Sequence, residues 1–249
     1  MLQHQGVNYL AVAFADEGVL LRERGIRMPI VVLNADEGSF DLMVAHRLEP
    51  EIYNFRSLAF FSKAVERVGE ESYPIHIKLD TGMHRLGFME EEIDRLCEVL
   101  PLRPEVKVAT VFSHLNCADM PEEDAYTREQ IACYDRMSAA VAASLPYSVI
   151  RHTANSAAIE RFPEAQFDMC RLGLGLYGFG FEHNDELKPV STLKSRIVQL
   201  KHLSAGEAVG YGRAGKLTRD SVTATVPMGY ADGLDRHLGC GRWSMLVAG

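Results

Sequence analysis

The chain has 249 residues, of which 47% are hydrophobic and 24% are charged, as is typical of a soluble globular protein. Its net charge of −8 argues against nucleic acid as a main partner, because phosphate binding needs a basic surface. No apolar run is long enough to span a membrane, and we expect no secretory leader. The five cysteines lack zinc-site spacing, so we expect free thiols, a cytoplasmic location and no metal.

Apolar, β-rich segments alternate with helical segments through most of the chain. The predicted strands cover residues 9–14, 29–33, 50–55, 73–79, 106–115, 148–153 and 167–177. The predicted helices cover residues 16–24, 39–47, 58–68, 89–100, 126–145 and 156–161. Asp16 and Ser57 are the expected caps of the first and third helices. This alternation indicates a parallel sheet of the α/β class.

The number of units predicts a barrel that lacks one of them. We count about seven βα units, whereas a closed (β/α)8 barrel has eight. We expect the missing unit to precede Met1, because residues 1–6 resemble the end of a helix. The fold prediction for residues 1–185 is therefore a TIM-like (β/α)8 barrel without its first βα unit.

The pattern changes after about residue 185. Polar and apolar residues alternate in 190–203, a turn follows, and residues 221–226 and 243–247 are strand-like. No long helix is predicted here. We expect residues 186–249 to begin a C-terminal β domain that is also incomplete, because the chain stops within a predicted strand.

Polar residues gather at the carboxyl ends of four predicted strands. They are Lys78 with Asp80 and Arg85, His114 with Asn116, His152 with Asn155 and Ser156, and Arg171. On a barrel these ends meet at one face, where active sites are found. Each residue alone also has a structural explanation. A lone histidine is often structural, Asn155 and Ser156 can cap a helix, and Arg171 can pair with Asp168 or Asp80.

Two further features are rich in glycine. Residues 173–178 follow Arg171, and their backbone N–H groups could hold a phosphate, although close packing of small residues is an equal alternative. Tyr211 and Tyr230 are flanked by glycines, which leaves their hydroxyls accessible to a ligand unless they are simply turn residues. Motifs for dinucleotides, P-loop nucleotides, serine hydrolases and zinc proteases are absent from the sequence.

Taken in order, these segments resemble the alanine racemases, which are pyridoxal-phosphate enzymes with a (β/α)8 barrel and a C-terminal β domain. The matching segments are residues 10–17, 78–87, 113–114, 154–157, 171–173, 177–178, 209–212 and 227–233. Residues 76–87 also look like racemase modules that are fused behind a cell-wall ligase. The resemblance implies that residues 1–185 bind the cofactor.

The resemblance also implies roles for single residues. Arg171 would hydrogen-bond the pyridine nitrogen, and His114 would lie near the ring. Ser156, Gly173 and Leu174 would hold the phosphate, with Asn155 supporting that wall. Tyr211 would be one catalytic base, acting across a homodimer interface. Arg85 and Tyr230 would contact the substrate, and Lys78 resembles a lysine that is often carbamylated in the family, which would orient Arg85.

The departures from the family pattern are as informative. The family's Schiff-base lysine, in a Lys-Ala-x-Ala-Tyr-Gly-His-Gly type of segment, has no match, and neither has the later Cys-Met-Asp segment. We therefore expect the parent protein to interconvert L- and D-alanine by two-base proton transfer, supplying D-alanine for peptidoglycan. We expect the 249-residue chain alone to be inactive. Alternatives are a racemase for another amino acid such as serine, a basic amino-acid decarboxylase, and a non-catalytic cofactor-binding module.

Overall fold

The computed structural model describes residues 1–182 and 184–247. The chain divides into two compact units, Met1–Val190 and Ser191–Gly249, and each is described here by itself. None of the described helices is long and apolar enough to cross a membrane. All five cysteines are free thiols, as the sequence predicts.

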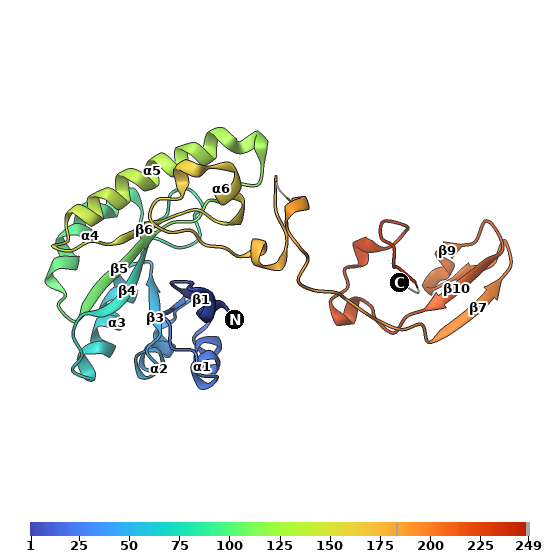
Figure 1. Ribbon diagram of the computed structural model, residues 1–249, viewed down its shortest axis with the longest axis horizontal. Coiled ribbons are helices and arrows are strands. Elements are labelled where there is room, and N and C mark those ends of the chain that lie inside the picture. The colour runs from blue at the N-terminus through green and yellow to red at the C-terminus, as the bar shows by residue number, and fades with distance from the viewer. Residues whose placement is uncertain (183, 248–249) are drawn as a thin grey trace. The chain divides into compact units, whose positions relative to one another are not determined.

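The first unit is built on a parallel sheet whose strands follow one another in chain order (Figure 1). Its six described strands are β1 (Leu10–Val12), β2 (Ile30–Val32), β3 (Glu49–Ile52), β4 (Tyr73–Lys78), β5 (Val106–Phe112) and β6 (Ile150–His152). Because each strand pairs with the one before it, the sheet winds in one direction, as in a barrel. This half-barrel confirms the predicted fold class.

A helix follows each of these strands. The helices are α1 (Ala15–Glu23), α2 (Phe40–Ala45), α3 (Phe55–Arg67), α4 (Ile93–Val99), α5 (Asp124–Ala143) and α6 (Ser156–Arg161). In Figure 1, α1 to α5 form an arc around the strands. Asp16 does not cap α1. Instead, the Glu17 carboxylate, inside the first turn of α1, reaches back and accepts from the backbone N–H groups of Ala13 and Phe14. Asn54, not Ser57, caps α3, and its Oδ1 accepts from Ser57 N at 2.7 Å.

The two faces of the sheet differ in chemistry. On one face Ile75, Ile77 and Val111 are fully buried in the main apolar core, together with side chains of α2 to α5. On the other face the strands carry His76 and Lys78, each next to a partner on β5 in the parallel register. The apolar face drives folding by burial, and the polar face is left to form a site.

The prediction of a seventh strand at residues 167–177 is wrong. This segment makes only two backbone hydrogen bonds to the region of β6, from Asp168 N to Arg151 O and from Arg171 N to Ala154 O. Phe167 has a left-handed φ of 47°, and residues 174–177 form a 3₁₀ turn. The kink and the flexible glycines break the ladder after a few residues.

The second unit contains short antiparallel pairs. Strand β7 (Gln199–Leu203) pairs with β10 (Ser221–Thr225), and β8 (Ala208–Val209) pairs with β9 (Gly215–Lys216). This confirms the predicted change to a β region. Residues 243–247 are not a strand, which corrects the expectation for that segment. The exact boundary predicted at residue 185 remains a prediction.

Candidate active site

The carboxyl ends of β4, β5 and β6 lie in register. Lys78 is level with Phe112, and Phe112 is level with His152. Because residues level with one another on parallel strands point to the same face, these three side chains form one row. The Phe112 ring stacks on the His152 ring, with 5.0 Å between centroids. The predicted polar residues lie around this row.

Arg171 lies across this row. Its Nη2 donates to Ser113 O at 2.6 Å and to Thr153 O at 3.1 Å, and its Nη1 lies 2.8 Å from His152 Nδ1. Its guanidinium carbon stands 5.4 Å from the Phe112 ring centroid. Burial lowers the pKa of Arg171 to about 10, so the side chain is still a cation at neutral pH.

The predicted ion pairs of Arg171 with Asp168 or Asp80 are both wrong. Asp168 Oδ2 accepts from Arg151 N at 2.8 Å, and Asp80 Oδ1 accepts from the backbone N–H of Gly82 and His84. Carbonyl oxygens and histidine nitrogens satisfy Arg171 instead. Within the described residues the Nε–H of Arg171 has no partner, which leaves one fixed donor for a ligand.

His114 is a neutral imidazole beside this cation. Its Nδ1 lies 3.3 Å from Arg171 Nη2. Burial, followed by the positive charges of Arg171, Lys78 and Arg85, lowers the pKa of His114 to about 3. The ring can therefore pack against an aromatic ligand without adding a charge.

Lys78 is buried and paired with a residue that the sequence analysis missed. Its Nζ lies 4.0 Å from Glu51 Oε1 and 4.6 Å from the Phe112 ring centroid. Burial lowers the pKa of Lys78 and raises the pKa of Glu51. The signal was present in the sequence, because Glu51 is an acidic residue inside the predicted strand 50–55 and a buried charge needs a partner.

A tight loop carries Arg85 away from β4 and returns the chain to the sheet. Asp80 N donates to Phe88 O, and Phe88 N donates to Lys78 O, both at 2.9 Å. Gly87 allows this closure with a φ of +134°, and a Cβ there would lie 2.5 Å from Asp80 N. Arg85 is exposed, and its charge lowers the pKa of both Lys78 and His114.

Ser156 and the glycine-rich segment meet at the start of α6. Ser156 Oγ accepts from Gly173 N at 3.0 Å and from Gly175 N at 3.3 Å. The hydroxyl proton of Ser156 has no acceptor among the described residues, so it can be donated to a ligand. Asn155 is the N-cap, since its Oδ1 accepts from Ala158 N and its Nδ2 donates to Leu115 O. The Asn155 amide is therefore used in structure and not left for a ligand.

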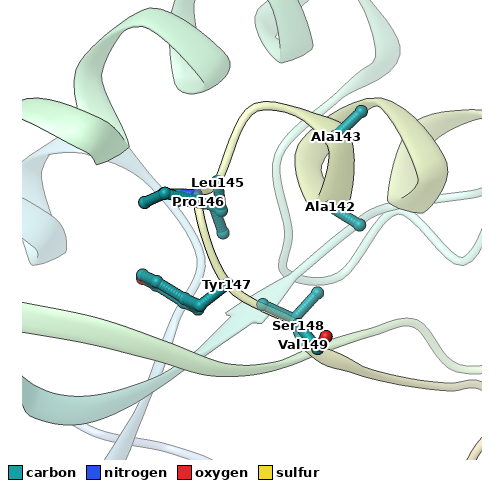
Figure 2. A pocket seen from close by; sticks show the side chains of 7 residues that line it. All are labelled: Ala142, Ala143, Leu145, Pro146, Tyr147, Ser148 and Val149. Carbon is teal, nitrogen blue, oxygen red and sulfur yellow. The ribbon is translucent and has the colours of Figure 1, made fainter.

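Tyr211 and Tyr230 both begin 3₁₀ turns in the second unit, at Tyr211–Arg213 and Tyr230–Asp232. Tyr211 is fully exposed and Tyr230 is 71% exposed. Figure 2 shows a pocket in the first unit between the end of α5 and the loop to β6, lined by Ala142, Ala143 and residues 145–149. It contains none of the candidate residues, and we assign it no function.

The first unit thus brings together Lys78, His114, Ser156 and Arg171, with Gly173 and Leu174 alongside. Together these residues offer a cation with one N–H that has no partner among the described residues, a neutral imidazole and a free hydroxyl proton. Such donors fit a planar heterocycle that has an unprotonated ring nitrogen and carries a phosphate.

Both parts of the chain match family models. Residues 1–180 match the model described as alanine racemase, N-terminal domain, and residues 190–249 match alanine racemase, C-terminal domain. The alanine racemase of Sorangium cellulosum is 36% identical over 254 residues, which cover 100% of this chain and 66% of that protein. The alanine racemase of Clostridium novyi is 36% identical over 245 residues, covering 95% of this chain and 62% of that protein.

Solved structures give the same result. The alanine racemase from D-cycloserine-producing Streptomyces lavendulae has a TM-score of 0.87 at 28% identity, covering 94% of this chain and 63% of that one. The alanine racemase from Bartonella henselae with covalently bound pyridoxal phosphate has a TM-score of 0.79 at 25% identity, covering 95% of this chain and 65% of that one. The chain therefore spans less than two thirds of the length of these relatives.

Proposed function

The chain belongs to the alanine racemase family, and we propose on that basis that its protein interconverts L- and D-alanine with pyridoxal phosphate. The observation that carries the proposal is the Arg171 cation, fixed by Ser113 O, Thr153 O and His152, with an Nε–H that has no partner among the described residues. When bound, pyridoxal phosphate supplies an electron-withdrawing ring that weakens the substrate's Cα–H bond.

Arg171 would hold the pyridine nitrogen. An arginine hardly gives up its proton, and with its pKa at about 10 Arg171 remains a donor at neutral pH. Arg171 would therefore donate to the ring nitrogen without protonating it. A donor of this kind at residue 171 would favour return of the proton to Cα over other reactions of the substrate. This preference supports racemisation over decarboxylation.

The phosphate would sit at the start of α6. The Ser156 hydroxyl and the backbone N–H of Leu174 are the donors we assign to it. Gly173 lines the same turn with its own N–H donated to Ser156 Oγ, and Asn155 fixes the start of the helix. His114, neutral at physiological pH, would pack near the ring. These donors are uncharged, so specificity for a phosphate rests on their number and direction.

The proton transfer would use two bases on opposite sides of Cα. We assign one to Tyr211, which would reach the site of a second copy in a homodimer. Arg85 and Tyr230 would bind the substrate. Lys78 is the lysine we propose to be carbamylated, and the lowered pKa of its amine supports this because carbamylation needs the neutral form.

Residues 1–249 alone should not racemise alanine. Among the described lysines only Lys78 lies at the site, and Glu51 is its partner at 4.0 Å. Lys78 is therefore not placed to serve as the second base. A cofactor-binding module without turnover is accordingly the second candidate for this chain. The free cysteines support a cytoplasmic location, where D-alanine would be made for peptidoglycan.

A racemase for another amino acid, such as serine, stays the alternative substrate assignment. The test is deuterium incorporation from heavy water into each alanine enantiomer, with a version of the protein that has the length of its relatives. Tyr211→Phe should slow exchange from L-alanine far more than exchange from D-alanine. Equal slowing from both sides would overturn the assignment of Tyr211, and faster exchange of serine than alanine would change the substrate.

A further inference from the structure

Arg171 stands at one end of a hydrogen-bond chain that crosses four strands of the sheet. The other members are His152, Thr110, His76 and Glu49, from β6, β5, β4 and β3. The distances are 2.8 Å from Arg171 Nη1 to His152 Nδ1, and 3.0 Å from His152 Nε2 to Thr110 Oγ1. They continue with 2.8 Å from Thr110 Oγ1 to His76 Nδ1, and 2.8 Å from His76 Nε2 to Glu49 Oε2.

The four members beyond Arg171 are buried. Thr110 is fully buried, and His76, His152 and Glu49 are exposed by only 1%, 4% and 9%. The Tyr9 ring packs against His76 at a right angle, with 5.6 Å between centroids. Water therefore has little access to these groups, and each of their protons must have its acceptor within the hydrogen-bond chain.

The two ends of the chain fix the direction of every proton. An arginine can only donate, so His152 Nδ1 must accept, and the neutral ring then carries its proton on Nε2. That Nε2–H donates to Thr110 Oγ1, which turns the threonine's own proton toward His76 Nδ1. His76 must then carry its proton on Nε2, where the Glu49 carboxylate accepts it.

No other arrangement uses every proton. If His76 were an imidazolium, its Nδ1–H would point at Thr110, and Thr110 would receive two donors with no acceptor for its own proton. Within the described residues the two histidine rings are the only partners of Thr110 Oγ1. Burial and the charge of Arg171 also hold the pKa of His152 well below its usual value, which keeps that ring neutral.

We propose that Glu49, His76 and Thr110 are positioning residues for Arg171, acting through His152 along this one-way chain. The inference rests on the proposed function only for what Arg171 holds. The chain fixes the plane of the guanidinium by one side-chain acceptor, in addition to the carbonyls of Ser113 and Thr153. It also ends on a carboxylate, so a negative charge stabilises the arginine from a distance without occupying its free Nε–H.

The first test needs no cofactor. In the protein with ¹⁵N-labelled histidine rings, NMR at neutral pH should show His76 and His152 as the Nε2–H tautomer, each with a hydrogen-bonded Nδ1. The two rings are assigned by comparison with His76→Gln and His152→Gln. An Nδ1–H tautomer or an imidazolium at either ring would overturn the proposal.

The second test asks whether the hydrogen-bond chain restricts the motion of the Arg171 guanidinium. Thr110→Val removes the hydroxyl at nearly constant volume, and Thr110→Ser keeps it. Rotation of the Arg171 guanidinium about Cζ–Nη, measured by ¹⁵N NMR, should be about fivefold faster in Thr110→Val, the factor that matches one neutral hydrogen bond. Thr110→Ser should keep the wild-type rate. Equal rates in all three forms would contradict the positioning role.

A third measurement separates this proposal from the proposed function. Pyridoxal phosphate binding to the same three forms is measured by equilibrium dialysis. Weaker binding in Thr110→Val than in Thr110→Ser supports both proposals. Correct tautomers and rotation rates without cofactor binding in any form would leave the hydrogen-bond chain in place and refute the cofactor role. Wrong tautomers with normal cofactor binding would refute the hydrogen-bond chain and leave the cofactor role in place.

Discussion

Arg171 and His152 are joined side chain to side chain, with 2.8 Å between Nη1 and Nδ1. Because the arginine can only donate, this contact makes the ring nitrogen an acceptor and keeps the imidazole neutral. Arg171 is thus held by neutral acceptors, and no carboxylate touches its guanidinium among the described residues. Its positive charge is left for a ligand, which is the property that the proposed cofactor site needs.

The loop that carries Arg85 should depend on Gly87. Gly87→Ala forces a side chain onto a φ of +134° and into contact with Asp80 N at 2.5 Å, and should cost more than about 2 kcal/mol of unfolding free energy. Gly25→Ala is the control, since Gly25 has a φ of +84° with nothing within 4 Å of a Cβ. It should cost about 1 kcal/mol. Equal costs in urea unfolding would rule out the close approach at Gly87.

Lys78 and Glu51 should behave as a coupled pair. Lys78→Met leaves the Glu51 carboxylate buried without a partner and should destabilise by about 3–5 kcal/mol, the usual cost of breaking a buried pair. The double variant with Glu51→Gln should be more stable than Lys78→Met alone.

The pH dependence gives a second check on this pair. Burial already raises the pKa of Glu51, and loss of the nearby cation raises it further. The carboxyl group can then protonate, so Lys78→Met should regain stability as the pH falls from about 8 to about 5. If the loss of stability in Lys78→Met does not change with pH, Glu51 is not the buried charge.

Ser156 should act on the phosphate of the cofactor and not on its ring. Ser156→Ala removes the free hydroxyl proton and should weaken pyridoxal phosphate binding by about tenfold or more, as expected for a hydrogen bond to a charged group. Binding of pyridoxal, which lacks the phosphate, should not change. Ser144→Ala, at the end of α5, is the matched control. Equal losses for both ligands would mean that Ser156 only shapes the turn.

His114 should give the protein a distinct acid sensitivity. Its pKa in the fold is about 3, against an ordinary value of 6.5. Above about pH 6.5 the ring is neutral in both states and contributes nothing to pH dependence. Between 6.5 and 3 the unfolded chain binds a proton that the folded chain does not, so stability falls as the pH falls. His114→Gln should flatten this slope, and an unchanged slope would contradict the buried neutral ring.

Much of the fold could be predicted from residue patterns alone. Apolar segments such as residues 29–33 and helices such as residues 156–161 are recognisable because burial selects their periodicity. The strand predicted at residues 167–177 was wrong because their apolar content suits a strand, while Phe167 and the glycines take conformations that a ladder does not accept. The cap at Asn54 was also missed, since Asn54 and Ser57 are both capping residues and differ only in their place in the turn.

The residues of the site could be predicted from the sequence, but their hydrogen-bond and ion-pair partners could not. Lys78 ends β4, and His114 and Ser156 come shortly after β5 and β6, whose carboxyl ends the parallel pairing brings together. Arg171 reaches the same place from a segment that is not a strand. The partners of Arg171 could not be read from the sequence, because two of them are backbone carbonyls that carry no residue identity. The pairing of Glu51 with Lys78 depends on the register between β3 and β4, which only the three-dimensional structure provides.

Arg171 should hold an unprotonated pyridine nitrogen. ¹⁵N NMR of the protein bound to pyridoxal phosphate labelled at the ring nitrogen measures this. We predict the resonance of an unprotonated, hydrogen-bonded pyridine at neutral pH, and a shift of that resonance in Arg171→Met but not in Arg24→Met, an exposed arginine on α1's far end. A pyridinium resonance in the wild-type protein, or one that does not change in Arg171→Met, would contradict the account.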